Sequence, residues 1–319
     1  MQAIITGISG QDGAYLAKEL LESGIKVIGL VRNEISSLAG LEYLGIAKDV
    51  EVLTIDLGAT SEINNLIKGI RPDYIFNLAA QSSVADSFKN PHPTMLFNLH
   101  STLNVLESIR SVSPHTRLYQ ATSSEMYGLV DKLPICENTL LNPQSPYAIS
   151  KSACHHLVNN YRDSYNLHVS SGILFNHESV LRRDNFFIMK IIKSALDIHH
   201  GKREYLEVGN IDIKRDFGYA PQYVKAMTKM IKMNEPDDYI ICSGKSISLR
   251  SILHHLFNYL DIDLDKIKIN TDLFRPSEII DIYGDNSKAK NKLGWNYDVE
   301  FTVVLEEILN EYRNNFYHA

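Results

Sequence analysis

The sequence predicts an α/β fold, with a doubly wound parallel sheet and a smaller, interleaved C-terminal α/β lobe. Two observations lead to this prediction. Short apolar, β-branched runs alternate with segments of helical apolar spacing up to residue 174, which is the pattern of right-handed βαβ units. After residue 175 the alternation becomes irregular. We therefore expect a sheet domain over residues 1–175, with later returns to the sheet, and a substrate-binding lobe mainly over residues 176–319.

The chain begins with a strand, a glycine-rich turn and a helix. Residues 2–6 form an apolar run typical of a buried strand, and residues 14–23 have helical apolar spacing. In the turn between them, Gly7 permits the tight bend, Gly10 lets the backbone approach a pyrophosphate, and Gly13 allows close packing of helix against strand. Because the N–H groups at a helix start face bound phosphates, this unit predicts a Rossmann-type dinucleotide site.

The second strand indicates which dinucleotide binds. It covers residues 26–31, ends in Arg32 and has no carboxylate at its tip. An acidic residue here would bond the adenosine ribose, whereas an arginine accommodates a 2′-phosphate. Arg32 therefore predicts NADP rather than NAD. After the next strand, residues 50–55, Asp56 and Leu57 are expected beside the adenine.

Three further strands and two helices complete the alternation. The strands are short and rich in β-branched or aromatic residues, and the helices have apolar residues at helical spacing. We expect the strands at residues 74–78, 117–121 and 168–174, and the helices at residues 94–111 and 147–165.

Candidate catalytic residues follow the fifth strand. Tyr147 and Lys151 are four residues apart, so they share one helix face and the ammonium can stabilise the phenolate. This stabilisation is expected to lower the pKa of Tyr147 towards neutrality and to make it a usable general base. Ser123 stands where its hydroxyl can face the same substrate oxygen, and Glu125 adds a second acid/base group. Such Tyr and Lys pairs are also common on solvated helices, so their structural context is decisive.

The composition excludes several classes of function. The chain has 319 residues, 44% of them hydrophobic, which can bury a large core. A net charge of −6 and a pI near 6.1 argue against a nucleic-acid or anionic-membrane surface. Three widely spaced cysteines fit a reducing compartment and no cysteine-based metal site. There is no room for a signal peptide before the first strand and no apolar run of membrane-span length, so we expect a cytoplasmic enzyme without metal, nucleic-acid or membrane partners.

A set of motifs spread from residue 4 to about residue 295 is more specific than the glycine turn alone. They are residues 6–13 (TGISGQDG), 77–82 (NLAAQS), 123–128 (SSEMYG), 145–151 (SPYAISK), 174–179 (LFNHES), 214–218 (KRDFG) and 275–278 (RPSE). In these motifs the chain resembles the GDP-mannose 4,6-dehydratase family, which belongs to the extended short-chain dehydrogenases/reductases that modify nucleotide sugars. Residues 292–295 (KLGW) also resemble the C-terminal signature of nucleotide-sugar enzymes in this superfamily.

The resemblance implies a redox-neutral loss of water from a GDP-hexose, with NADP taking up a hydride from carbon 4 and returning it to carbon 6. Tyr147 would take the proton of the 4-hydroxyl, and Ser123 would hydrogen-bond that oxygen. Lys151 would hold the Tyr147 anion and the nicotinamide ribose. Glu125 would remove the proton on carbon 5, which the new ketone acidifies, and water would leave from carbon 6. The implied product is a 4-keto-6-deoxy sugar.

The resemblance also implies two sets of binding residues. Two arginines in the substrate set suit a diphosphate, because each can bind it bidentately. The expected cofactor contacts are Gly7, Gly10, Gln11, Asp12, Gly13, Arg32, Asp56, Leu57, Leu78, Ala79, Ala80, Tyr147, Lys151 and His177. The expected substrate contacts are Ser82, Asn176, Lys190, Arg215, Arg275 and Glu278.

The chain departs from the family pattern near the expected sugar site. Ser123 replaces the usual Thr, and Val180-Leu-Arg-Arg183 stands where the family has Pro-Arg-Arg-Gly. The segment after Arg32 is shorter and has Asn33 in place of a second Arg. The hexose identity therefore stays open between GDP-mannose and a variant such as GDP-N-acetylglucosamine or a GDP-heptose.

Two other functions share most of these motifs. A nucleotide-sugar 4-epimerase or 4-keto reductase would use the same Ser, Tyr and Lys but leave Glu125 idle. A non-enzymatic NADP-binding regulator would be expected to have lost Tyr147 or Lys151, and both are present.

The resemblance also implies a homo-oligomer. The helices at residues 94–111 and 147–165 commonly pair with their copies in a two-fold dimer of this superfamily, and both carry apolar stripes. A homotetramer in relatives uses the loop after the second strand, which is shortened here around residues 33–40. We expect a homodimer, with a homotetramer as the less favoured alternative.

Overall fold

A seven-stranded parallel sheet forms the centre of the molecule. The computed structural model describes residues 1–33, 37–274 and 277–317. The strand order is β10-β6-β5-β4-β1-β2-β3, and all neighbours are parallel, which confirms the predicted doubly wound sheet. The strands are β1 (Gln2–Thr6), β2 (Lys26–Val31), β3 (Val50–Thr54), β4 (Tyr74–Asn77), β5 (Arg117–Ser123), β6 (Val169–Leu174) and β10 (Asp238–Ile241).

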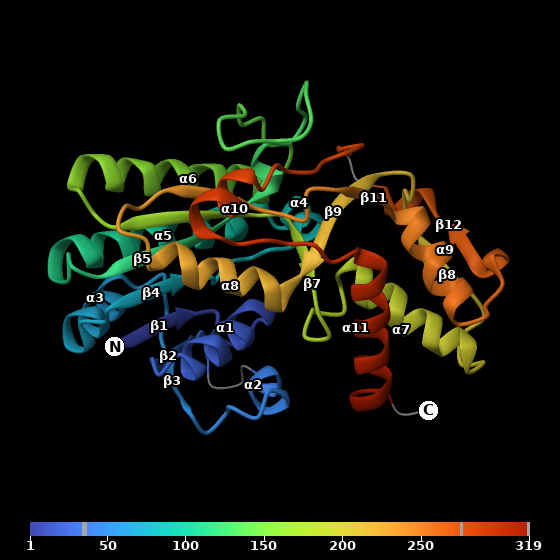
Figure 1. Cartoon of the computed structure of the whole chain (residues 1–319), viewed down its shortest axis with the longest axis horizontal. Coiled ribbons are helices and arrows are strands. Elements are labelled where there is room, and N and C mark those ends of the chain that lie inside the picture. The colour runs from blue at the N-terminus through green and yellow to red at the C-terminus, as the bar shows by residue number, and fades with distance from the viewer. Residues whose placement is uncertain (34–36, 275–276, 318–319) are drawn as a thin grey trace.

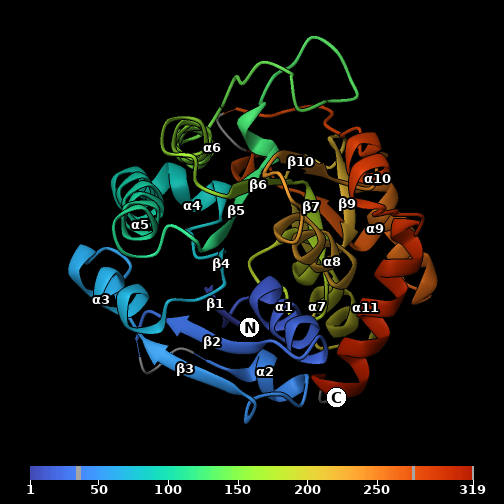
Figure 2. The same cartoon turned by 60° about the vertical axis from the view of Figure 1, so that its left-hand side comes forward.

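Helices cover both faces of this sheet (Figure 2). One face carries three helices that pack side by side, and the other carries the first helix together with two that come from late in the sequence. The first group is α3 (Thr60–Ile70), α5 (Pro91–Val112) and α6 (Pro146–Tyr165), and the second is α1 (Gln11–Glu22), α8 (Ala220–Ile231) and α10 (Ser287–Leu293).

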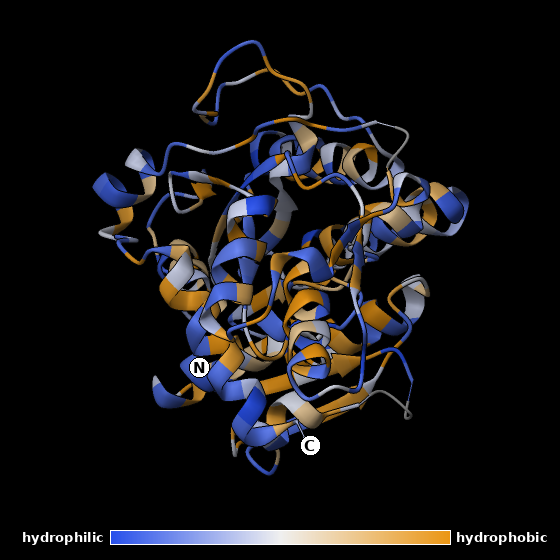
Figure 3. Cartoon of the chain, turned by 90° about the vertical axis from the view of Figure 1, so that its right-hand side faces the viewer, coloured by the Kyte–Doolittle hydropathy of each residue, from blue (hydrophilic) through white to orange (hydrophobic). Residues whose placement is uncertain are grey.

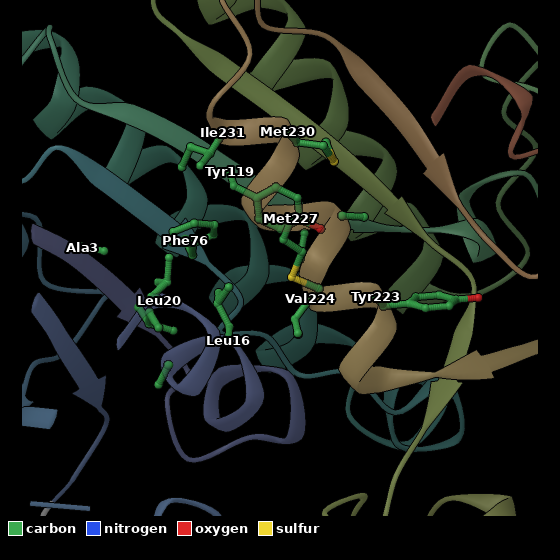
Figure 4. Packing of buried hydrophobic residues seen from close by; sticks show 14 of the residues in the cluster. Ala3, Leu16, Leu20, Phe76, Tyr119, Tyr223, Val224, Met227, Met230 and Ile231 are labelled. Carbon is green, nitrogen blue, oxygen red and sulfur yellow. The ribbon is translucent and has the colours of Figure 1, made fainter. Parts of the chain in front are cut away.

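The core between the sheet and the second group of helices explains why the chain returns to the sheet. Phe76 and Tyr119 project from β4 and β5 towards Leu16 on α1 and Met227 on α8 (Figure 4). All four side chains are fully buried. Because α1 alone leaves apolar surface on the sheet uncovered, α8 completes the layer, and residues far apart in the sequence share one core.

A smaller lobe lies beyond the carboxyl ends of the strands (Figure 1). It has its own hydrophobic core, built on three helices and two small sheets. Its helices are α7 (Phe187–His199), α9 (Leu249–Tyr259) and α11 (Phe301–Asn315). Its strands form a β11-β9-β7 sheet (Ser246–Ser248, Lys214–Tyr219, Asn176–Glu178) and a β12-β8 pair (Ile267–Ile269, Leu206–Val208).

Hydropathy follows this layering. Seen from the side of the lobe, hydrophobic residues run along the central strands, whereas the helices carry both hydrophobic and hydrophilic residues (Figure 3). Within residues 1–33, 37–274 and 277–317, no helix has the length and apolar character that crossing a membrane requires. The remaining short elements are α2 (Ala39–Tyr43), α4 (Val84–Lys89) and the 3₁₀ turns η1 (Ser124–Met126), η2 (Leu264–Lys266) and η3 (Thr271–Leu273).

Candidate active site

The glycine turn between β1 and α1 is packed too tightly for side chains. Gly7 has a φ of +73°, in the region that favours glycine. A Cβ on Gly13 would lie 2.4 Å from the Gly7 carbonyl oxygen, and a Cβ on Gly10 would lie 3.2 Å from the same atom. The backbone therefore forms a bare cradle at the start of α1, and these residues fit the diphosphate of a nicotinamide dinucleotide.

A polar cluster ties the start of α1 to β7. His177 Nε2 lies 2.9 Å from Asp12 Oδ2, and Gln11 Nε2 donates to the His177 carbonyl oxygen at 3.0 Å. Ser179 Oγ donates to Gln11 Oε1 at 2.7 Å. Both the amide nitrogen and the amide oxygen of Gln11 are thus hydrogen-bonded within the protein. We therefore expect Gln11 to contact a cofactor through its backbone.

Asp12 and His177 form an ion pair in which His177 is buried and Asp12 is partly exposed. Burial alone would raise the pKa of Asp12, but the charge and hydrogen bond of His177 outweigh it and the pKa is lowered. Burial alone would lower the pKa of His177, but Asp12 outweighs it and the pKa is raised. Both shifts favour the charged pair, which clamps the glycine turn against the lobe.

A cavity lies beside the cradle at the tip of β2, where the fold of a dinucleotide site places the adenosine, and we call it the adenosine cavity. Arg32 and Leu57 line it as the sequence predicts, and Arg32 Cζ stands 5.8 Å from the Phe97 ring centroid. Asp56 is not among the lining residues, because its Oδ1 accepts a hydrogen bond from the Gly58 backbone at 2.9 Å. The lining comprises Gly7, Ser9, Leu30, Val31, Arg32, Asn33, Ile55, Leu57, Ala79, Ala80, Gln81, Asp86, Asn90, Pro93, Thr94, Phe97 and Arg183.

A second cavity opens between the sheet edge and the lobe, and we call it the reaction cavity. All four expected catalytic residues line it. Ala80 lines both this cavity and the adenosine cavity, so the two adjoin. Other predicted residues in its wall are Asp12, Leu78, Ser82, Asn176, His177 and Arg215.

Local structure places the four catalytic side chains. Ser123 ends β5, and its Oγ accepts a hydrogen bond from the Glu125 backbone at 3.3 Å, which starts the turn η1 that carries Glu125. Ser145 caps α6 by accepting from the Ala148 backbone at 3.1 Å. Tyr147 therefore lies in the first turn of α6, with Lys151 one turn further along.

The prediction that Lys151 lowers the pKa of Tyr147 was wrong. Burial raises the pKa of Tyr147 to about 12, with the neighbouring Ser123 hydroxyl opposing this shift. Lys151 Nζ donates to the Ala121 carbonyl oxygen at 2.9 Å, and burial lowers the pKa of the lysine. The ammonium is thus held by strand β5, and desolvation of the phenol dominates.

Sequence analysis missed two charged residues of the reaction cavity. Arg182 stands 3.4 Å from the buried carboxylate of Glu178 and lies over the Phe186 ring at 3.6 Å from its centroid. Its charge lowers the pKa of Tyr147, whereas burial raises the pKa of Glu178. The sequence placed the segment 180–183 near the expected sugar site, but it gave no signal that Arg182 would pair with Glu178 beside Tyr147.

Two of the predicted substrate contacts that the structure describes, Lys190 and Glu278, lie outside both cavities. Lys190 Nζ donates to the Glu207 carbonyl oxygen at 2.9 Å and lines neither cavity, and nor does Glu278. Arg275 lies outside the described residues. Arg215 is buried in the wall of the reaction cavity, where its guanidinium donates to the Ile279 carbonyl oxygen at 2.6 Å.

The sequence matches the family model described as GDP-mannose 4,6 dehydratase over residues 4–308. The chain belongs to this family. It is 36% identical to the GDP-mannose 4,6 dehydratase of Drosophila melanogaster, with 96% of this chain and 85% of the relative covered. GDP-mannose 4,6 dehydratase 1 of Arabidopsis thaliana is 38% identical, with 97% and 89% covered. These matches confirm the family that the motifs predicted.

Solved structures with low sequence identity share the fold of this family member. A dTDP-glucose 4,6-dehydratase from Streptomyces venezuelae, with NAD bound, has a TM-score of 0.90 at 20% identity and covers 99% of this chain and 98% of its own. A UDP-glucose 4-epimerase from Thermotoga maritima has a TM-score of 0.88, also at 20% identity, and covers 99% and 100%. Because dehydratases and epimerases share this architecture, the fold alone does not separate the two reactions.

Proposed function

We propose that this chain is a GDP-mannose 4,6-dehydratase that forms the 4-keto-6-deoxy sugar without net oxidation or reduction. The observation that carries the proposal is the arrangement of Ser123, Glu125, Tyr147 and Lys151 in the wall of one cavity that adjoins the dinucleotide cradle. The names of relatives at 36–38% identity support the same reaction. A bound nicotinamide dinucleotide would take up a hydride at the start and return it at the end.

The side chains of this family member have distinct tasks in the proposal. Tyr147 takes the proton from the sugar 4-hydroxyl while Ser123 donates a hydrogen bond to the same oxygen. The Arg182 charge favours the Tyr147 anion against the effect of burial. Glu125 removes the proton on carbon 5, which allows water to leave from carbon 6. Lys151 keeps its ammonium beside β5 and orients the nicotinamide ribose.

NADP is the cofactor that we propose. Arg32 lines the adenosine cavity, and no carboxylate stands at the tip of β2 to bond a ribose hydroxyl. The related folds include a dTDP-glucose 4,6-dehydratase with NAD and the RMD protein of Pseudomonas aeruginosa with NADPH, the latter at a TM-score of 0.81. Both cofactors therefore occur on this fold, and the proposal depends on Arg32.

A 4-epimerase or 4-keto reductase is the competing reaction. Either would use Ser123, Tyr147 and Lys151 but has no step for a base at Glu125. Glu125 lines the reaction cavity and also a small adjoining cavity that contains Arg215, so it faces the substrate side rather than solvent. This position favours the dehydratase.

Mass spectrometry of the sugar product tests the proposal. Purified chain with NADP⁺ and GDP-mannose is expected to release a product lighter by one water, with no lasting absorbance of reduced nicotinamide. Tyr147→Phe is expected to reduce the rate by about 10²–10⁴-fold. GDP-N-acetylglucosamine and a GDP-heptose are run in parallel, because Leu181 and Arg183 depart from the family pattern. A product of unchanged mass, or accumulation of reduced nicotinamide in step with product, would contradict the proposal.

We also propose a homodimer formed through α5 and α6. Both helices cover the same face of the sheet, and Leu96, Ile149 and Tyr165 leave 46%, 46% and 48% of their surfaces exposed on them. Exposed apolar side chains on neighbouring helices are suited to a two-fold interface. Light scattering is expected to give twice the 36.1 kDa mass of the chain, and a monomer at micromolar concentration would refute the dimer.

A further inference from the structure

A small cavity adjoins the reaction cavity on the side of Glu125. Val84, Glu125 and Arg215 line both cavities, which places the small cavity directly beside the expected base. It lies where α4, the turn η1, strand β9 and the residues just before α6 meet. Its wall is formed by Val84, Phe88, Glu125, Gln144, Ser145, Arg215, Ser277 and Ile279.

The small cavity has the size of one water molecule. Its volume is about 10 Å³, against about 240 Å³ for the reaction cavity. One buried water needs roughly 10–15 Å³ and two to four polar partners. The size therefore selects water over any part of a sugar.

Polar residues of the wall can hold such a water. Gln144 Nε2 donates to the Asn142 carbonyl oxygen at 2.8 Å, which leaves the Gln144 amide oxygen to accept a further hydrogen bond. Ser145 Oγ accepts from the Ala148 backbone at 3.1 Å, and its hydroxyl hydrogen can still be donated. A water in the small cavity can thus donate to Gln144 and accept from Ser145.

Glu125 supplies a third partner. Its backbone N–H donates to Ser123 Oγ, but its carboxylate forms no hydrogen bond or ion pair within residues 1–33, 37–274 and 277–317. A half-buried carboxylate without a partner loses the solvation that it has in water. A water molecule restores this solvation by donating a hydrogen bond. The carboxylate therefore stands between the substrate on one side and the small cavity on the other.

We propose that the small cavity receives the water that is eliminated from carbon 6. This inference rests on the proposed dehydratase reaction. The Glu125 carboxylate takes the proton from carbon 5, the C5–H electron pair forms the second bond between carbons 5 and 6, and the C6–O bond breaks with its pair on oxygen. That oxygen takes the proton from Glu125 and leaves as water, which restores the carboxylate. The proton that Tyr147 took from the 4-hydroxyl balances the one that carbon 5 regains when the hydride returns.

Transfer of this water out of the reaction cavity favours the last step. Water that stays beside carbon 6 can add back to the double bond, which competes with return of the hydride to the same carbon. In the small cavity the water is held by Glu125 and by the amide oxygen of Gln144. The small cavity thus assists the steps after elimination and has no part in the oxidation at carbon 4.

Rapid-mixing absorbance of reduced nicotinamide tests this site in the full chain with NADP⁺ and GDP-mannose. The rise reports hydride abstraction from carbon 4, and the decay reports hydride return after elimination. Ser277→Leu fills the small cavity and is expected to slow the decay by about tenfold or more, the scale of a lost hydrogen bond to a charged group. The rise should stay within about twofold of wild type, because Ser277 does not line the reaction cavity.

Two further variants complete the test. Gln144→Met keeps the length of the side chain but removes the amide, and it should slow the decay by about two- to tenfold. This variant carries the test if Ser277→Leu does not fold. Ser61→Leu, at an exposed position on α3, is the matched control and should behave as wild type.

The outcomes separate this inference from the proposal beneath it. A slower decay with an unchanged rise would support the water site, since only steps after the oxidation then depend on the small cavity. An unchanged decay in every cavity variant that folds, or an equal slowing of rise and decay, would overturn it. A wild-type product of unchanged mass would instead refute the dehydratase reaction itself.

Discussion

The catalytic segment, residues 123–151, and the crossing segment, residues 179–186, meet at the same edge of the sheet but contribute differently. The catalytic segment provides the groups that touch the reacting sugar in our proposal, all within one βα unit. The crossing segment provides Arg182, which lines the reaction cavity, and Arg183, which lines the adenosine cavity. Reactive groups can thus be close together in the sequence while their electrostatic environment comes from another lobe.

The largest expected effect lies in the catalytic segment. Glu125→Gln removes the base for carbon 5 and should reduce product formation by about 10²–10⁴-fold. Since Tyr147 is intact, the first step continues, and reduced nicotinamide should accumulate with GDP-mannose. Absorbance and product mass measured on the same sample check this.

Glu62→Gln, at an exposed position on α3, is the control. Full formation of the dehydrated product by Glu125→Gln would show that this carboxylate has no part in the elimination.

The next effect tests the clamp between α1 and β7. Asp12→Asn leaves His177 without its charged partner and should lower the free energy of unfolding by about 1.5–3 kcal/mol, the scale of a hydrogen bond to a charged group. The pKa of Asp12 is depressed below its ordinary 3.8, so its contribution is lost as the pH falls. The pKa of His177 is raised above 6.5, so its contribution is lost as the pH rises through that raised value.

The gap between wild type and Asp12→Asn should therefore be widest between about pH 4 and pH 6.5. Urea unfolding across the pH range measures it. A gap that stays constant with pH would mean that Asp12 acts through packing, and the ion pair would be refuted.

A smaller effect is expected from the crossing segment. Arg182→Gln removes the charge that lowers the pKa of Tyr147, so that pKa should rise and the ascending limb of the pH–rate profile should move to higher pH. Arg313→Gln should leave the profile in place. The profile is measured at saturating GDP-mannose and NADP⁺. If the ascending limb of Arg182→Gln stays in place, the charge of the crossing segment has no influence on the base in the catalytic segment.

The smallest effect is expected at Lys190. Its ammonium donates to the Glu207 carbonyl oxygen and lines neither cavity, so Lys190→Ala should change the KM for the GDP-sugar by no more than about twofold. Asn176→Ala, in the wall of the reaction cavity, should raise the same KM more. A large KM increase for Lys190→Ala would restore the sequence-based prediction that it contacts substrate.

Sequence patterns alone predicted the parallel sheet, the glycine cradle and the closeness of Ser123, Glu125, Tyr147 and Lys151. These features depend on periodicity and on short spacings, because a strand end and the following helix start are close in any βα unit. For the same reason Arg32 was found at the tip of β2.

The electrostatic environment of the site, in contrast, depends on how the chain packs in three dimensions. The pKa of Tyr147 follows from how deeply the ring is buried, and the roles of Arg182, Arg183, Glu178 and Lys190 follow from where the lobe packs on the sheet. Desolvation and Coulomb interactions depend on distance in space and on exclusion of water. Neither is set by distance along the chain, so no motif could reveal them.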